Sequence, residues 1–395
     1  MLIFRLEIKM ESSHKKLLYM DGLNYADSFF QREGSFWKIE DARQLVAEFV
    51  EATRNSGWKL EVFIDAGIQS DEAQRKWKER REDDVRTGSL GMPVGLQFIL
   101  SSLYIENGIK VHHSKVDNDD TLAAYAQAHG AAILSRDKDF FRYRQMTYTV
   151  YKEFDIHNGK LLLTKRDFFL HDSPRALMLD PLPETYKSLP TIDRISLTRQ
   201  CQRGASSPLT KVFGNIQTKI MPLKRQFFFE IGIPIDQTIR VYYPEWDKKK
   251  KQVIWVDELV TPCDDPVQKS FLYDNPFGGI DYYFWEYITD MIPKPESCSK
   301  NNWMNHKFCC CATILELSCI LTGNSFVDML LQAKDKYFVG DKQSRKDNIM
   351  KAAGALKKNC DRCGKNFEIS EKERRKLQEM KVKESNRCQK CLFSK

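Results

Sequence analysis

The chain has 395 residues, of which 42% are hydrophobic and 12% aromatic, and its formal net charge is +8. This length is enough for two or three domains, and the apolar content excludes a wholly disordered chain. No apolar run approaches the roughly 18 residues that a membrane span needs, and the first ten residues carry too many charges for a secretory signal. Eleven cysteines do not make a disulfide scaffold in a chain this long, so we expect an intracellular protein, nuclear or cytoplasmic, with no membrane partner.

The positive charge is concentrated in one part of the chain. Residues 341–395 contain 17 Lys and Arg against 8 Asp and Glu, so they carry a net charge of +9 and the remainder carries −1. A basic segment of this kind either contacts a polyanion such as nucleic acid or acts as a solubilising segment. The sequence leaves both interpretations open.

Residues 15–170 alternate between short apolar runs and amphipathic segments. The apolar runs predict strands at 16–21, 60–65, 108–114, 131–137 and 146–151. The segments between them predict helices at 39–57, 71–86, 93–108 and 119–130, and glycine closes three of them, at Gly57, Gly108 and Gly130. Strands that alternate with helices favour an α/β fold of three layers, α/β/α, around a central parallel sheet.

The rest of the chain lacks this alternation. Residues 171–222 are rich in proline and small polar residues, which predicts a linker or an irregular region. Residues 223–335 combine strand-like pieces, among them QFFFEIGIPI and QVIWVDELV, with two apolar helical patterns at 305–323 and 325–333. We therefore expect an α+β and helical middle domain. The run DKKKK at 247–251 favours a hairpin turn, and a contact with nucleic acid is the alternative.

Aspartates lie at the ends of four of the predicted strands. Asp21 closes the first and Asp65 the second, Asp119 and Asp120 follow the third, and Asp137 and Asp139 follow the fourth. The carboxyl ends of parallel strands meet at one edge of a sheet, so we expect these side chains to converge there. Crowded carboxylates repel one another unless a cation lies among them, and ligands that are all oxygen suit Mg²⁺ or Mn²⁺. Such ions activate water for displacement at phosphorus.

The same aspartates also have a structural interpretation. Asp is a preferred helix N-cap, which fits Asp117 and Asp119 before the helix, and a preferred turn residue, which fits Asp137 and Asp139. Each aspartate taken alone can be explained in this way. Four strand ends that are all followed by aspartate favour the metal site.

Three motifs, YMDGLNY, VFIDAG and DDTLAAYAQAHGAAILSRDKDF, resemble those of the PIN nuclease superfamily over residues 15–155. The sequence FIDAG followed by a charged helix is similar to the XPG or flap-endonuclease branch, and within it to the asteroid-type group. The paired Asp119 and Asp120 are similar to the NYN-type ribonucleases. The resemblance implies a PIN-like fold and Asn24 as a polar neighbour of the first aspartate. It also implies Mg²⁺ or Mn²⁺ ligands at Asp21, Asp65, Asp120, Asp137 and Asp139, with Asp119 beside them in the catalytic set.

Two features depart from the XPG-like pattern. Its glutamate pair is replaced by Asn118 and Asp120, and no helix–turn–helix DNA clamp is recognisable after residue 155, which argues against specificity for flap structures. The charged helix at 71–86 either presents its basic residues to a phosphate backbone or is a solvated helix with internal ion pairs. Equal numbers of acidic and basic residues favour the second interpretation.

Two other residue groups are interpreted as structural. His112 and His113 are neighbours on a predicted strand, so they point to opposite faces and at least one of them belongs to the core. Cys309 to Cys311 are consecutive positions of an apolar helix, about 100° apart around its axis, so they are poorly placed to chelate one metal. We expect them to be buried small apolar residues.

Two CxxC pairs lie near the end of the sequence, Cys360 with Cys363 and Cys388 with Cys391. Each pair can offer two thiolates to one tetrahedral Zn²⁺, and two pairs complete its ligand shell. The opening CDRCGKNF resembles a family of short zinc ribbons. With four protein ligands the zinc would be structural, and a redox dithiol is the alternative.

The sequence thus predicts five regions: a PIN-like nuclease domain at 15–170, a linker or irregular region at 171–222, the middle domain at 223–335, a basic linker at 336–357 and a zinc ribbon at 358–395. The favoured function is a nuclease that depends on Mg²⁺ or Mn²⁺ and acts on RNA or DNA. The alternative is a catalytically weak PIN scaffold that binds nucleic acid or protein through its middle region and ribbon. A carboxylate cluster favours the enzyme, because a scaffold has no need of one.

Overall fold

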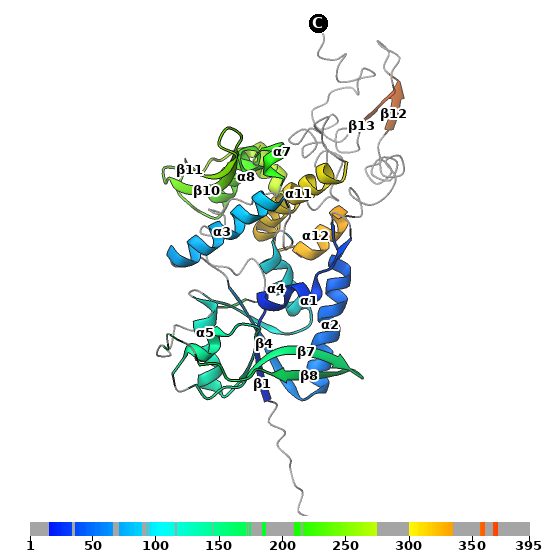
Figure 1. The fold of residues 1–395 in the computed structure, drawn as a ribbon. Coiled ribbons are helices and arrows are strands. Elements are labelled where there is room, and N and C mark those ends of the chain that lie inside the picture. The colour runs from blue at the N-terminus through cyan, green and yellow to red at the C-terminus, as the bar shows by residue number, and fades with distance from the viewer. Residues whose placement is uncertain are drawn as a thin grey trace, which may run out of the picture. The chain divides into compact units, whose positions relative to one another are not determined.

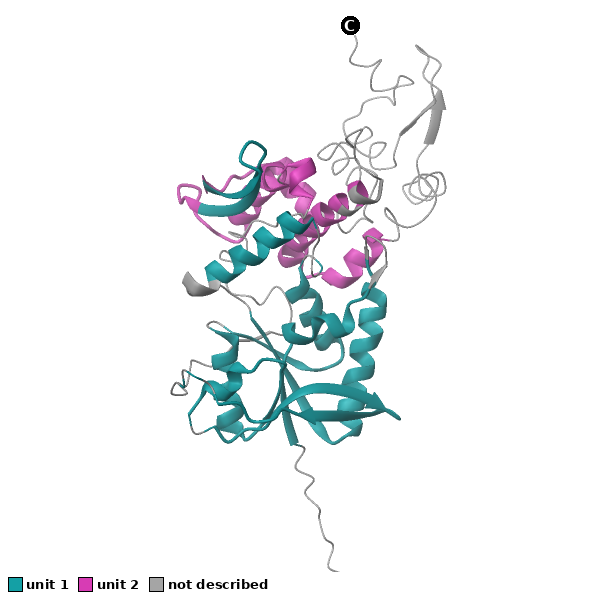
Figure 2. Ribbon diagram, viewed as in Figure 1, with its two compact units in different colours: residues 1–208, 240–258 teal, residues 209–239, 259–395 magenta. Residues whose placement is uncertain are grey.

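The fold is taken from a computed structural model, which describes residues 16–170 with gaps at 34–35, 66–70, 89–92, 94, 115–116 and 145. It also describes residues 172, 174, 184–186, 209–274 except 215, 300–334, 356–359 and 366–369. The chain divides into two compact units (Figure 2). The first comprises residues 1–208 and 240–258, and the second comprises 209–239 and 259–395.

The first unit is built on a seven-stranded sheet in the order β8-β7-β6-β1-β4-β5-β9. Its five inner strands are parallel, as predicted. They are β1 (Lys16–Asp21), β4 (Trp58–Asp65), β5 (Lys110–Ser114), β6 (Ala132–Leu134) and β7 (Val150–His157). The predicted strand at 146–151 begins later than expected, at Val150. The prediction of a helix-covered parallel sheet is confirmed.

Two antiparallel strands at the edges of this sheet were not predicted. β8 (Lys160–Lys165) pairs with β7 through a two-residue turn in which Asn158 and Gly159 have positive φ angles of 51° and 67°. The sequence Asn-Gly is typical of such hairpin turns. β9 (Glu184–Tyr186) pairs with β5 and comes from the region expected to be irregular.

Helices cover the two faces of the sheet (Figure 1). α2 (Ile39–Asn55) packs against β4, β8 and α4 (Leu96–Glu106), whereas α5 (Asn118–His129) packs against β1, β4, β5 and β6. Neighbouring residues of β1 show that these are opposite faces. Tyr19 lies in the core with Leu122 of α5, and Met20 receives a contact from the hydroxyl of Tyr104 in α4. The crossover from β1 through α2 and the return through α5 therefore enclose the sheet in three layers.

Short elements complete this unit. They are η1 (Leu23–Tyr25), α1 (Ala26–Phe29), β2 (Arg32–Glu33), β3 (Phe36–Trp37) and η2 (Asp139–Arg142). The turn after β1 is tight. A Cβ atom added to Gly22 would lie 2.8 Å from Cγ1 of Val62, and its N–H donates to the carbonyl of Phe63 at 2.8 Å. Glycine at this position lets the backbone that leaves β1 lie directly against β4.

α3 (Asp71–Thr87) packs against a hairpin formed by β10 (Ile239–Asp247) and β11 (Gln252–Val260). Trp77 of the helix contacts Tyr242 and Trp255 of the hairpin, with ring centroids 5.7 and 5.4 Å apart. Several charges of α3 form pairs within the helix, including Arg81 with Asp84 at 3.0 Å. The exposed pairs Arg75–Glu79 and Arg86–Asp83 match the ion-paired helix that the sequence favours, whereas another face of α3 packs on the hairpin. The hairpin turn predicted at 247–251 is present.

The described part of the second unit contains mainly helices. Its helices are α7 (Thr210–Phe213), α8 (Ile216–Glu230), α9 (Pro266–Asp274), α11 (Lys300–Thr322) and α12 (Phe326–Ala333). α11 packs against α8, α9 and α12, and it buries Cys309, Cys310 and Cys311 as predicted. Two further strands, β12 (Leu356–Asn359) and β13 (Asn366–Ile369), form an antiparallel pair.

One strand-like segment was interpreted wrongly. The run QFFFE belongs to α8, which begins at Ile216 inside the predicted irregular region and continues through Pro222 to Glu230. Phe227 and Phe228 are fully buried, so the aromatic run reports burial and not strand geometry. Proline within the helix and a run of phenylalanines both disfavour a helix when only local pattern is considered.

Candidate functional site

Asp21 is the buried centre of the acidic group. It is the last residue of β1, and 8% of its surface is exposed. One carboxylate oxygen accepts a hydrogen bond from Nδ2 of Asn118 at 3.4 Å, and the other accepts from Oγ of Ser135 at 3.4 Å. The backbone of Asn24 also bonds to this carboxylate. Polar side chains from the start of α5 and the end of β6 therefore fix the orientation of Asp21.

The turn after β6 carries the next two carboxylates. Asp137 donates its backbone N–H to Oγ of Ser135 at 3.2 Å, and the N–H of Asp139 donates to Oδ1 of Asp137 at 2.9 Å. The side-chain oxygen of Asn24 accepts from the N–H of Arg136 at 2.8 Å, which ties this turn to the one after β1. The predicted placement of Asn24 close to the first aspartate is thus seen in the structure.

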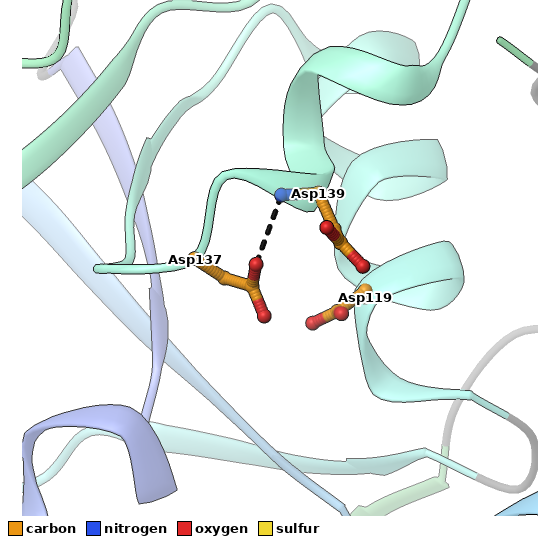
Figure 3. A group of neighbouring side chains, drawn as sticks. All are labelled: Asp119, Asp137 and Asp139. Carbon is orange, nitrogen blue, oxygen red and sulfur yellow. Dashed lines mark hydrogen bonds between the residues drawn. The ribbon is translucent and has the colours of Figure 1, made fainter. Parts of the chain in front are cut away.

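Asp119 enters from the first turn of α5. The N-cap residue Asp117 accepts hydrogen bonds from the N–H groups of Asp119 and Asp120, at 3.0 and 3.3 Å. One carboxylate oxygen each from Asp119, Asp137 and Asp139 lies within 4.8 Å of the others. Figure 3 shows the three side chains converging from the helix and from the turn.

The position of this cluster follows from the topology of the sheet. From β1 the chain proceeds to β4 and β5 on one side and then returns to β6 and β7 on the other. In open α/β sheets the crevice beside such a reversal, at the carboxyl ends of the strands, is where ligands bind. The reversal lies between β1 and β6. Asp21 is the last residue of β1, and Asp137 lies in the turn that follows β6.

Crowding changes the acidity of two of these groups. Burial raises the pKa of Asp21 to about 7, and the charges of Asp137 and Asp65 add to the effect. Burial likewise raises the pKa of Asp119 to about 8, with contributions from Asp21, Asp117 and Asp137. Both carboxyls lie in surroundings that disfavour their negative charge, which is the condition that a bound cation reverses.

Arg142 is a site residue that the sequence analysis missed. Its guanidinium lies 2.9 Å from Asp139, 3.4 Å from Asp120, 3.8 Å from Asp117 and 4.0 Å from Asp119. The spacing of three residues from Asp139, within one turn, was the available signal. The contacts with Asp117, Asp119 and Asp120 depend on the packing of η2 against α5, which spacing alone does not reveal.

The two remaining predicted ligands lie outside the closest group. Asp120 contacts the hydroxyl of Tyr143 and Arg142, and Arg142 also pairs with Asp139. Of this consecutive pair, Asp119 is the residue with an oxygen within 4.8 Å of oxygens of both Asp137 and Asp139. The metal-ligand role that the resemblance implies for Asp120 stays a prediction. Asp65, at the end of β4, contributes its charge to Asp21.

The two histidines of β5 belong to the sheet core. Nε2 of His112 lies 2.8 Å from Glu61, and Nε2 of His113 lies 2.9 Å from Oγ of Ser101. Burial lowers the pKa of His113 to about 3, so its imidazole is neutral. Both histidines are therefore structural, in agreement with the prediction that at least one would be.

The donor set of the cluster fits a hard divalent cation. All its ligating atoms are carboxylate oxygens, which is the preference of Mg²⁺ and Mn²⁺. The predicted zinc ligands, Cys360, Cys363, Cys388 and Cys391, lie outside the described residues. No described helix is at once long enough and apolar enough to cross a membrane.

Comparison of the chain with protein-family models, with curated proteins and with solved structures gave no significant match. The chemistry of the site must therefore be inferred from its own geometry.

Proposed function

We propose that the first unit is a metal-dependent nuclease that hydrolyses phosphodiester bonds in RNA or DNA. The observation that carries the proposal is the convergence of Asp119, Asp137 and Asp139 within 4.8 Å, next to the buried Asp21, at the topological reversal of the sheet. The PIN-like motifs of the sequence point to the same chemistry. Mg²⁺ or Mn²⁺ held by these residues would supply a charge that lowers the pKa of a bound water and stabilises the phosphorane-like transition state.

The roles of the residues follow from their positions. Asp119, Asp137 and Asp139 would hold the cation. Asp21, behind them, would add negative charge close to the ion, and its orientation is fixed by Asn118 and Ser135. In the reaction a water oxygen bonds to phosphorus, one P–O ester bond breaks, and the leaving oxygen takes a proton. The products are a phosphate monoester end and a hydroxyl end.

A catalytically weak scaffold is the second candidate, and one observation favours it. Arg142 already contacts two carboxylates of the cluster, Asp119 and Asp139, and the neighbouring Asp117 and Asp120, so its guanidinium could neutralise them in place of a metal. On this reading the cluster would be a structural ion-pair network, and the protein would bind nucleic acid or a protein partner without cleaving it. The two candidates differ in whether the cluster binds metal.

Incubation with labelled substrates distinguishes them. The purified chain should be incubated with single-stranded, duplex and flap substrates of both RNA and DNA, in Mg²⁺, in Mn²⁺ and in EDTA. Cleavage that requires the metal supports the enzyme. Absence of cleavage from every substrate in both metals would contradict it and favour the scaffold.

The zinc ribbon of residues 358–395 stays part of the proposal. Its basis is the spacing of Cys360, Cys363, Cys388 and Cys391 in the sequence. Metal analysis of the freshly reduced full chain should find about one equivalent of zinc, which replacement of Cys360 by Ser should abolish. A chain without zinc would leave the redox dithiol as the better interpretation.

A further inference from the structure

An exposed apolar segment follows β8 in the first unit. Its residues, which we call the rim patch, are Phe168, Phe169 and Leu170, with 70%, 42% and 78% of their surfaces exposed. Single exposed apolar residues are ordinary on protein surfaces, but neighbouring ones that form a patch mark an interaction site. Two of these three carry aromatic rings.

Three contacts hold the rim patch against the turn that carries Asp137 and Asp139. Arg166, two residues before the patch, donates to the backbone carbonyl of Arg136. Nζ of Lys138 lies 5.4 Å from the ring centroid of Phe169. The ring of Phe168 meets that of Phe141 edge to face, with centroids 5.6 Å apart. Lys138 lies between the two aspartates in sequence and Phe141 follows them, so the patch adjoins the acidic cluster.

Phe168 is held on one side and open on the other. Its partner Phe141 is buried in the core that packs under α5, which fixes the base of the ring contact. The ring itself stays largely exposed. An anchored but open ring is suited to stacking on a flat, planar group, because little conformational freedom is lost when it binds.

Positive charge lies beside the patch. The side chain of Lys138 is exposed and lies over the ring of Phe169, whereas the guanidinium of the neighbouring Arg136 is paired with Asp27 at 2.7 Å. Arg144 and Lys165 are also exposed, three residues in sequence from Phe141 and Phe168. The carboxylates of Asp119, Asp137 and Asp139 lie at the cluster itself, and the ammonium group of Lys138 lies beside the ring of Phe169. Cations next to exposed aromatic rings are the combination by which proteins bind unpaired nucleic-acid strands, with phosphates on the cations and bases on the rings.

We infer that the rim patch stacks the bases of a single-stranded nucleic acid whose backbone lies at the acidic cluster. This inference rests on the proposed nuclease function and narrows its substrate to unpaired strands. In a duplex the faces of the bases are stacked on one another and are not available to Phe168 and Phe169. A protein partner would have no use for cations in this arrangement unless it were acidic, and that case is an outcome of the test below.

The test measures binding separately from cleavage. Fluorescence anisotropy should be recorded with a labelled single strand of about 12 nucleotides, with an abasic strand of the same length and with a duplex. All proteins carry Asp137→Asn so that the strands stay intact. We expect Phe168→Ala with Phe169→Ala to weaken binding of the base-bearing strand about tenfold or more, and to change binding of the abasic strand and the duplex less than about twofold.

Two control variants separate stacking from other causes. Phe168→Leu with Phe169→Leu keeps an apolar patch without rings and should lose affinity like the alanine pair. Leu162→Ala removes another exposed apolar side chain, on β8 with 54% of its surface exposed, and should bind as the parent does. Unchanged circular dichroism and melting temperature would show that each variant folds.

Several outcomes would overturn the inference. Equal loss for the base-bearing and abasic strands would mean that bases are not stacked on the patch. Full affinity in the leucine pair would mean that an apolar surface suffices. Binding of no strand by the parent, or a concentration-dependent dimer that the alanine pair abolishes, would assign the patch to a protein contact. A protein that passes this test yet cleaves no substrate would retain the binding site and lose the proposed nuclease function.

Discussion

Two groups of buried ionisable side chains lie on the same parallel sheet and balance their charge in opposite ways. Glu61 of β4 pairs with His112 of β5 at 2.8 Å and with Lys59 at 3.0 Å. The hydrogen bond from His112 is the largest cause that lowers the pKa of Glu61, to about 2. At the carboxyl edge of the sheet, the pKa of Asp21 and that of Asp119 are instead raised, to about 7 and about 8.

The difference separates a structural pair from a site that calls for a cation. The side chains of His112 and Lys59 stabilise the charged form of Glu61, so this carboxylate needs no bound cation. In the acidic cluster Arg142 contributes one positive charge against the four carboxylates it contacts. Surroundings that disfavour ionisation are common at functional sites, and a divalent ion is the simplest partner that restores the balance.

The largest effect should come from the cluster. Asp137→Asn removes one charged ligand and keeps the size of the side chain, so we expect cleavage to fall by about 100-fold or more. Asp155→Asn is the matched control, because Asp155 is an exposed aspartate of β7. The rate should be measured by gel assay with labelled substrate. Equal cleavage by both variants would remove Asp137 from the mechanism.

Disruption of the Glu61–His112 pair should have a smaller effect. It should lower the stability of the protein and leave metal binding unchanged. Glu61→Gln replaces a carboxylate that bonds to His112 with a neutral amide. We expect the free energy of unfolding to fall by about 2 kcal/mol, the usual contribution of a buried hydrogen bond to a charged group. Denaturant unfolding at neutral pH measures the loss. Weaker Mn²⁺ binding in Glu61→Gln would contradict the view that the Glu61–His112 pair is independent of the acidic cluster.

The smallest expected effect is the change in the free energy of unfolding with pH in the metal-free protein. In the unfolded chain Asp21 and Asp119 ionise near pH 4, and in the folded protein they ionise near 7 and 8. As pH rises from 4 to 8 the unfolded state loses these protons first. Stability should therefore decline over this window, by more than about 1 kcal/mol relative to Asp21→Asn.

Unfolding of wild type and Asp21→Asn in EDTA, at several pH values, measures that difference. Added Mn²⁺ should restore the stability of the wild type near pH 8, because the ion favours the charged carboxylates. Parallel pH profiles for the two proteins without metal would contradict the assigned environment of Asp21. Glu61 has the opposite effect at low pH. Its charged form stabilises the folded protein, and this contribution is lost as pH falls through its lowered pKa.

Most of the site could be predicted because it depends on order along the chain. Apolar runs that alternate with helical patterns specify a parallel sheet, and the rule that strand ends meet at one edge brings Asp21, Asp137 and Asp139 together. The closeness of Asp119, and not of Asp120, to both Asp137 and Asp139 depends on the rotation of α5, whose N-cap is Asp117. A shift of one helix position would change which residue is closest, and sequence pattern does not define helix starts so closely.

The features that escaped prediction depend on contacts between distant segments. Arg142 reaches α5 because η2 packs against it, and Phe168 contacts Phe141 of η2 because β8 returns along β7. The Asn158–Gly159 turn was the local signal for that return. α8 was not predicted because Pro222 and the run of phenylalanines are unfavourable for a helix when only the local sequence is considered. The helix is stabilised by its packing against α9 and α11.

Calorimetric titration of Mn²⁺ tests the central claim most directly, because it asks whether the acidic cluster is completed by a metal or by Arg142. Wild type, Asp137→Asn and Asp155→Asn should be titrated at pH 8, where the carboxyls of the cluster are most readily ionised. We predict saturable binding to wild type and Asp155→Asn, and an affinity at least about tenfold lower for Asp137→Asn. Equal affinity in all three proteins, or no binding to wild type, would contradict the metal site and leave the cluster as an ion-pair network around Arg142.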